Sequence, residues 1–256
     1  MLLDPGTLPT LGLVLIRTSA FILASPLLGD GSGFAGYKVG LIGVLSLLSF
    51  SLLELPLEAA VGPLEFGAMA AREVLIGAAL AFVMQSALLA VRVGGELIGH
   101  EMAFNMSSIA DPSTGVNTPL ITRIYEGLFL LGLLAVDGHH VLIRALAESF
   151  DRAPVGRIAV ETGLVHGVRV LFSEMFTAGL TFAAPVTVLL VLVSLLIGLL
   201  ARAVPQLNVL EVGFTLRILV ALVAMLAFAP LFAPAMAGLY EALDAGLASM
   251  LDGLQV

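Results

Sequence analysis

Residues 170–201 read VLFSEMFTAGLTFAAPVTVLLVLVSLLIGLLA, and Glu174 is the only charged residue among them. A membrane-spanning helix needs about 20 consecutive apolar residues, so this run is long enough for one span or for two shorter helices. Pro185, near the middle of the run, has no backbone N–H and is a natural break or kink in a helix. The stretch therefore predicts a helical fold in an apolar environment.

Other apolar runs precede and follow this stretch. They cover residues 11–28, 39–57, 74–93, 120–136 and 209–233. Most of them have the length of a membrane span, and some are marginal. Residues 236–251 are expected to add a C-terminal amphipathic helix. The sequence predicts an all-α, polytopic membrane protein with about six to seven hydrophobic helices in a single domain that covers residues 1–256.

The overall composition supports an integral membrane protein. Hydrophobic residues make up 59% of the chain and charged residues only 12%, whereas about a quarter of the residues of a soluble globular protein are charged. The formal net charge is −8, which excludes the basic surface of a nucleic-acid-binding protein. Cysteine is absent, so disulfides, thiolate metal sites and cysteine nucleophiles are excluded as well.

The histidines do not form a recognisable catalytic or metal-binding motif. A zinc-protease motif that begins at His100 would need a second histidine at position 104, which is Phe104. His139 and His140 are adjacent, so on a helix their side chains point about 100° apart and are not expected to share one metal ion. The sequence also lacks a Gly-x-Ser-x-Gly motif and a phosphate-binding Gly-Lys pair. We therefore predict no catalytic residue, no cofactor, no metal site and no enzymatic activity.

Residues 94–115 differ from their apolar neighbours and read GGELIGHEMAFNMSSIADPSTG. A backbone that leaves regular helix among membrane helices has to line a cavity or be shielded by protein, because lipid cannot satisfy its amide groups. Met102, Phe104 and Met106 could form a flexible apolar gate, since apolar side chains at a constriction exclude water and ions. The alternative is that these side chains fill a gap in a static core. Their position between long apolar runs favours the gate.

Two other function classes remain open at this point. A secondary transporter would have paired broken helices in two repeated halves, but only one broken region is obvious and no second copy is found. A membrane-embedded hydrolase or acyltransferase would need a nucleophile that acts together with His100, His139 or His140, and the sequence offers no credible one. The basic residues divide almost evenly between the two sets of loops, so they do not predict the orientation in the membrane. Arg17 and Arg217 interrupt apolar runs, where a charge is costly in lipid, so both are expected to face partners or water.

Several motifs, in order along the chain, carry a resemblance to a known family. They are RTSA (17–20), SPLLG (25–29), REVLIG (72–77), GELIG (95–99), DPSTG (111–115), DGHH (137–140), AVPQLNV (203–209) and VGF (212–214). Together they make the chain similar to the FliR/SctT family, the export-gate membrane proteins of flagellar and virulence type III secretion systems. The general resemblance favours the flagellar branch. Glu211 departs from the family pattern, in which an apolar residue is expected.

The resemblance implies a specific cellular role. Members of this family join FliP- and FliQ-type subunits in a cone of packed helical hairpins, through which unfolded substrates cross the bacterial inner membrane in the flagellar basal body. They work beside FlhA- and FlhB-type export proteins. Because the cone sits partly above the membrane plane, not all of the helices need to cross lipid. This arrangement fits the absence of tryptophan, since a Trp/Tyr belt usually marks the membrane interface.

The resemblance also implies roles for individual residues. The family's pore plug precedes the Asp-Pro motif and corresponds here to residues 102–110. The predicted plug or gate residues are Met102, Phe104, Asn105, Met106, Ser107, Ser108 and Ile109. The predicted structural motif residues are Gly95, Glu96, Gly99, Asp111, Pro112, Gly115, Pro205, Gln206 and Asn208.

Overall fold

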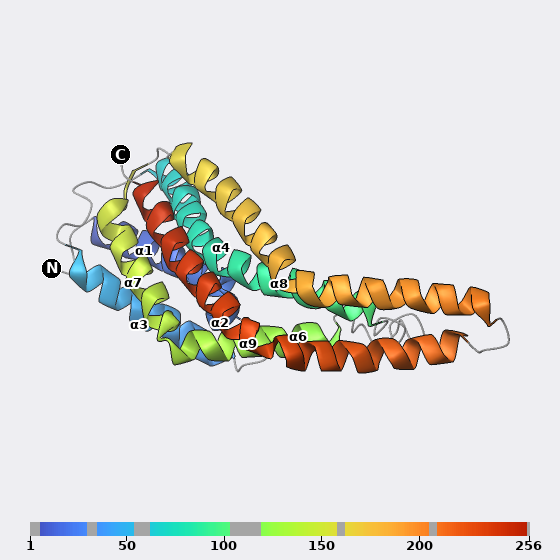
Figure 1. The fold of residues 1–256 in the computed structure, drawn as a ribbon. Helices are drawn as coiled ribbons and strands as arrows, with labels where there is room; N and C mark the ends of the chain where they lie inside the picture. Colours follow the sequence, from blue (N-terminus) through green and yellow to red (C-terminus); the bar gives the residue numbers. More distant parts are fainter. Residues whose placement is uncertain are drawn as a thin grey trace. The chain divides into compact units, whose positions relative to one another are not determined.

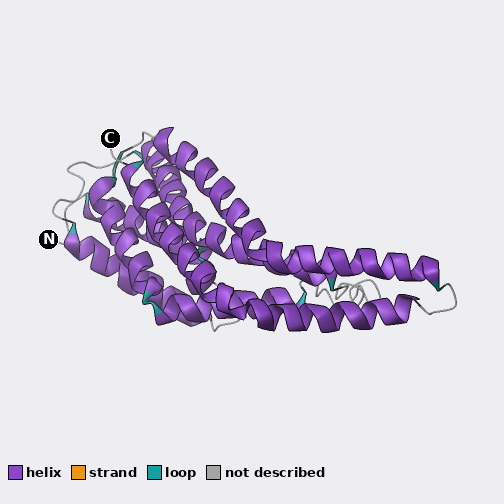
Figure 2. Ribbon diagram, viewed as in Figure 1, coloured by secondary structure: helices purple, strands orange, loops and turns teal. Residues whose placement is uncertain are grey.

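The structure is a computed structural model that describes residues 6–29, 35–53, 62–102, 119–157, 162–204 and 209–254. Nearly all of these residues lie in helices, and none of them lies in a β-strand (Figures 1 and 2). The prediction of an all-α fold is confirmed.

The helices are α1 (Thr7–Ala24), α2 (Pro26–Gly29), α3 (Ala35–Leu52), α4 (Pro63–Glu101), α6 (Leu120–Ala135), α7 (Gly138–Arg152), α8 (Thr162–Ala203) and α9 (Val209–Asp252). Within the described residues α1, α4, α8 and α9 are each long and apolar enough to cross a membrane. A fifth candidate span is the pair α6 and α7, which is bent by 71°, and α3 adds a shorter apolar helix. A polytopic membrane protein is therefore confirmed, with a span count close to the one expected.

The prolines do not divide the long helices. Pro185 lies inside α8, and Pro230 and Pro234 lie inside α9. A break at Pro185 would remove many backbone amides from their hydrogen bonds in apolar surroundings, whereas a continuous helix loses only the bond that the proline cannot donate. The C-terminal segment 236–251 likewise continues α9 without a break.

Residue contacts group the chain into two compact units. The first contains Met1–Ser86, Leu134–Ser173 and Glu241–Val256, and the second contains Ala87–Leu133 and Glu174–Tyr240. The long helices α4, α8 and α9 each contribute one part to each unit. The sequence prediction of a single domain stays a prediction.

In the first unit, α1, α4 and α7 contribute most of the core. Its fully or nearly fully buried apolar side chains include Leu13, Val14, Phe21 and Ile22 of α1, Ile76, Leu80 and Met84 of α4, and Leu142 and Leu146 of α7. Gly77 brings α1 and α4 into backbone contact, because a Cβ atom at this position would lie 2.5 Å from the carbonyl oxygen of Arg17. A side chain at position 77 would separate the two helices.

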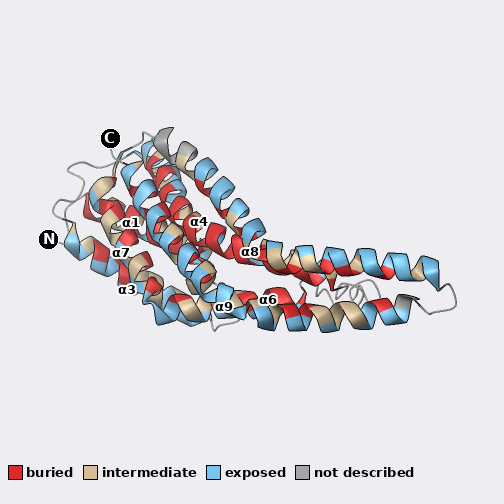
Figure 3. Ribbon diagram, viewed as in Figure 1, coloured by how far each residue is buried: buried red, intermediate tan, exposed pale blue. Residues whose placement is uncertain are grey.

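Burial differs strongly among the long helices (Figure 3). In α4, 67% of the most apolar window is buried inside the chain, but the corresponding shares are 28% in α8 and 11% in α9. Much of the large apolar surface of α8 and α9 is therefore left to lipid or to other proteins.

Candidate functional site

Met102 is the one predicted gate residue that the structure describes. It is fully buried, and its backbone N–H donates a hydrogen bond to the carbonyl oxygen of Ile98 at 3.0 Å, just beyond the end of α4. The side chain is therefore part of the packed core where α4 ends. The other gate residues lie outside the described residues. They are Phe104, Asn105, Met106, Ser107, Ser108 and Ile109.

Two predicted motif glycines bring together the described residues on either side of residues 103–118. Gly95 and Gly99 lie one turn apart on α4. A Cβ atom at Gly95 would lie 2.7 Å from the Cα of Thr122, and one at Gly99 would lie 2.6 Å from the Cβ of Pro119. The last turns of α4 thus contact the start of α6 almost backbone to backbone. As a result, Met102 and Pro119, the described residues on either side of 103–118, lie at the same end of the contact between α4 and α6.

An aromatic cluster supports α6 from the side of α8 and α9. The ring of Tyr125 lies 5.2 Å from that of Phe182 and 5.3 Å from that of Phe232, and the two phenylalanine rings are 5.5 Å apart. Further along α6, the hydroxyl of Tyr240 donates a hydrogen bond to the carbonyl oxygen of Phe129 at 3.0 Å. Large aromatic side chains with few rotatable bonds give a rigid contact, so the helix that begins beside Gly95 and Gly99 is held firmly within the second unit.

The other motif residues have simpler positions. Glu96 is half-buried on α4. Glu211, the departure from the family pattern, is exposed in the first turn of α9, where a carboxylate interacts favourably with the helix dipole. The remaining motif residues lie outside the described residues. They are Asp111, Pro112, Gly115, Pro205, Gln206 and Asn208.

The first unit contains a buried charge cluster that consists of Arg17, Arg72 and Glu73. The Nε of Arg17 donates a hydrogen bond to Oε2 of Glu73 at 2.5 Å, and both side chains are fully buried. Nη1 and Nη2 of Arg17 donate to the carbonyl oxygens of Ser149 and Ala153, each at 2.7 Å. These bonds link α1 both to α4 and to the C-terminal end of α7.

Arg72 completes the charge cluster. Its Nη1 lies 3.5 Å from Oε1 of Glu73 and donates to the carbonyl oxygen of Pro154 at 3.2 Å. One carboxylate therefore contacts two guanidinium groups, which also donate hydrogen bonds to carbonyl oxygens at and just beyond the end of α7. Those carbonyls form the negative end of the helix dipole, which favours a nearby cation. The ring of Phe150 lies 4.3 Å from the guanidinium carbon of Arg17 and adds a cation–π contact.

Comparison with known proteins identifies the family of this chain. The family described as "Bacterial export proteins, family 1" matches residues 8–243. The chain belongs to this family. It is 33% identical over 242 residues to the flagellar biosynthetic protein FliR of Escherichia coli (strain K12), a match that covers 94% of this chain and 92% of the relative. It is 32% identical over 221 residues to FliR of Bacillus subtilis (strain 168), with 85% of each protein covered.

Membership in the FliR family makes the chain a multi-pass membrane protein of flagellar export. The FliR protein of Pectobacterium carotovorum is also similar, with 29% identity over 242 residues. These relatives are all named as flagellar proteins, in agreement with the flagellar branch that the general resemblance favoured.

The charge cluster joins two of the motifs that carried the resemblance to the FliR family. Arg17 begins the motif at 17–20, and Arg72 and Glu73 begin the motif at 72–77. Sequence reasoning expected Arg17 to face a partner or water, because a charge in an apolar run is costly in lipid. The sequence did not identify Glu73 as the partner, although an acidic residue next to an arginine in another apolar run is a usable signal.

Proposed function

We propose that this FliR-family chain is a core, non-enzymatic subunit of the flagellar type III export gate. In this proposal it assembles with FliP- and FliQ-type subunits in the bacterial inner membrane, beside FlhA- and FlhB-type export proteins. Together they form the channel through which unfolded flagellar substrates leave the cytoplasm. Residues 102–110 act as the plug that closes this channel between transport events.

The plug assignment is supported above all by the contact between the described residues that flank 103–118. Gly95 and Gly99 bring the end of α4 against Thr122 and Pro119. A loop whose two ends are fixed side by side can change its own conformation without pulling the flanking helices apart. Such a loop can yield to a passing polypeptide and then close again.

The residue types of the segment suit closure against ions. Met102, Phe104 and Met106 supply apolar side chains, and methionine adapts its shape to uneven surroundings. An apolar constriction excludes water and therefore ions. Tight closure is needed because a membrane potential drives ions through any opening. The driving free energy is about 2.3 kcal/mol per unit charge for each 100 mV of potential.

Assembly with other subunits is supported by the exposed apolar surface of α8. Its exposed large apolar side chains extend from Val170 to Leu200. At 1.5 Å rise per residue this distance is about 45 Å of helix, whereas the hydrocarbon core of a bilayer is about 30 Å thick. Lipid alone does not cover an apolar face of this length, so we infer that partner subunits cover part of it.

Co-expression with FliP- and FliQ-type subunits tests the assembly. The chain carries the affinity tag, the complex is purified in mild detergent, and its mass is determined by native mass spectrometry. We expect a stable mixed complex of defined mass. A monomer or homodimer, with both partners well expressed but absent from the preparation, would contradict the proposal and favour a small-solute transporter, which substrate-uptake assays can detect.

A further inference from the structure

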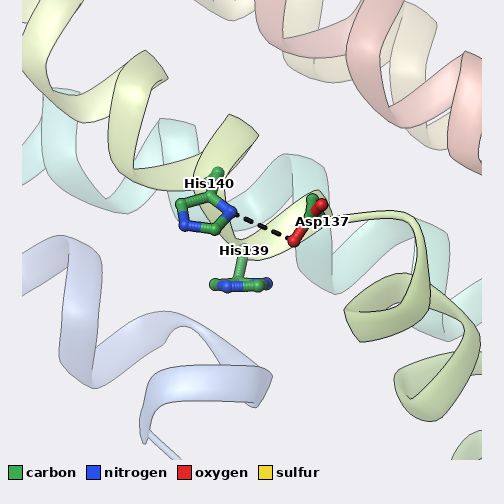
Figure 4. A group of neighbouring side chains, drawn as sticks. All are labelled: Asp137, His139 and His140. Carbon is green, nitrogen blue, oxygen red and sulfur yellow. Dashed lines mark ion pairs between the residues drawn. The ribbon is translucent and has the colours of Figure 1, made fainter.

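The bend between α6 and α7 brings together three side chains that have no part in the plug or in the charge cluster. Asp137 precedes α7 in a left-handed backbone conformation with φ 57°, which no other non-glycine residue of the described part of the chain adopts. His139 and His140 follow in the first turn of the helix. Figure 4 shows the two imidazoles on the same side of the turn, close to the carboxylate of Asp137.

The distances in this group fit a shared ligand. Nδ1 of His140 lies 3.3 Å from Oδ1 of Asp137, and the centroids of the two imidazole rings are only 4.1 Å apart. One ligand atom from each of the three residues can be chosen so that all three lie within 4.8 Å of one another. The offset of about 100° between adjacent helix positions does not separate the rings, because side-chain torsions as well as the Cα–Cβ direction determine where a ring lies.

His139 provides a second observation that points to a ligand. Its Nδ1 is closed off from solvent and has no hydrogen-bond partner in the part of the chain that the structure describes. A buried polar atom in this situation needs an explanation, and a bound ion is one of the usual ones. The side chains of Asp137 and His140, by contrast, are 75% and 64% exposed, so both can rotate toward a common centre.

We propose that Asp137, His139 and His140 form a binding site for a divalent transition-metal ion, with zinc as the physiological candidate. Two imidazoles and one carboxylate suit zinc, copper or nickel, whereas magnesium and calcium prefer ligand sets made of oxygen atoms alone. With zinc–ligand bonds of about 2.0–2.2 Å, the ligand atoms of a tetrahedral site lie about 3.4 Å apart. Small rotations of the two exposed side chains achieve this spacing. The fourth position is left for water.

The surroundings set the expected strength of the site. The N-terminal end of α7 carries partial positive charge, which opposes a cation. The carboxylate of Asp137 lies at the same end and offsets this charge. Two of the three ligand side chains are also exposed to solvent. We therefore expect a dissociation constant in the micromolar range, weaker than that of a closed structural zinc site.

Metal titration of the full-length chain tests this proposal independently of the export gate. The protein is purified in detergent with an affinity tag that contains no histidine, is stripped with a chelator, and is titrated with zinc by calorimetry. Cobalt is titrated in parallel, because its visible absorption reports tetrahedral coordination. We expect one equivalent of zinc to bind.

Matched variants locate the site. Loss of a residue that merely supports a ligand weakens metal binding by about 10–100-fold, so His139→Ala and His140→Ala should each weaken zinc binding by at least about tenfold. Asp137→Asn should also weaken it and should change the cobalt spectrum. His100→Ala removes an exposed histidine from α4 and should leave binding unchanged.

Two results would overturn the proposal. One is a wild-type chain that binds no stoichiometric zinc at concentrations well above the micromolar range. The other is zinc binding that both histidine variants retain at wild-type strength. The thermal unfolding midpoint of each metal-free variant is measured first. If a histidine variant fails to fold, the zinc affinity of Asp137→Asn is compared with that of the wild type, and equal affinities would contradict the proposal.

Discussion

At the scale of single residues, the costliest groups to bury are the charges of Arg17, Arg72 and Glu73. Removing a charge from water costs several kcal/mol, and this cost is offset only by close, well-oriented partners. In this chain every charge of the cluster has one, through the Arg17–Glu73 bond, the nearby Arg72 and the carbonyls at the end of α7. The cluster therefore fixes how α1, α4 and α7 pack, more than it adds net stability.

Replacing Glu73 by glutamine should destabilise the protein strongly. The variant keeps the size of the side chain but removes the buried carboxylate that contacts both guanidinium groups, and breaking a buried ion pair typically costs about 3–5 kcal/mol. A large fall in the thermal unfolding midpoint of the detergent-solubilised protein is the expected readout. Glu126→Gln is the matched control, because it breaks the 2.5 Å pair with Arg92, whose side chain is 46% exposed, and such a pair contributes at most about 1 kcal/mol. Equal effects of the two variants would show that the charge cluster has no special role.

At the scale of helices, the contact between α4 and α6 brings together the residues that flank 103–118. Gly95 and Gly99 permit this contact because they have no side chain. Not every glycine has this function: a Cβ atom at Gly127 of α6 would meet nothing within 4 Å. The two kinds of glycine can therefore be compared within the second unit.

Gly95→Ala should weaken the contact between α4 and α6. The added methyl group would lie 2.7 Å from the Cα of Thr122, so the helices must shift, and overpacking of this kind typically costs about 1–3 kcal/mol. Gly127→Ala adds the same methyl group to a helix where there is space and should be neutral or stabilising by up to about 1 kcal/mol. Thermal unfolding of both variants in detergent gives the comparison. A Gly95→Ala variant as stable as Gly127→Ala would mean that the close approach is not required.

The helices themselves were largely predictable from the sequence, but their ends were not. Apolar runs located most of them, since hydrophobic length identifies a membrane span directly. The run at 74–93 nevertheless lies inside α4, which extends from Pro63 to Glu101. Polar and glycine residues at both ends made this helix look shorter. Pro185 was expected to be a break or a kink, and the structure excludes the break, because α8 continues through it.

The site was predictable in part. The sequence identified Arg17 as a charge that needs a partner and the two motif glycines as packing residues. It could not show that Arg17 meets Glu73, because the two residues are far apart in the chain and no local pattern encodes their contact. Nor could helix spacing show that the rings of His139 and His140 come within 4.1 Å of each other.

At the scale of the whole molecule, the chain buries some of its apolar surface and leaves much of it exposed. The most apolar window of α4 is mostly buried, whereas that of α9 is 11% buried. A membrane protein whose helices exposed this surface only to lipid would usually carry interfacial tryptophan, and this chain has none. The pattern agrees with a subunit that completes its packing against partners, and the native mass measurement described above tests it.

The most direct test of the account is the ion conductance of the assembled gate with and without its plug side chains. Residues 104–109 are replaced by a glycine/serine segment of equal length, which leaves Met102 and the glycine contacts of α4 in place. Wild-type and variant complexes of the same native mass are reconstituted in lipid bilayers, with Gly127→Ala as a control. We predict low conductance for the wild type and for Gly127→Ala, and a clear leak for the plug variant. A plug variant that conducts no more than the wild type would contradict the assignment of this segment as the gate.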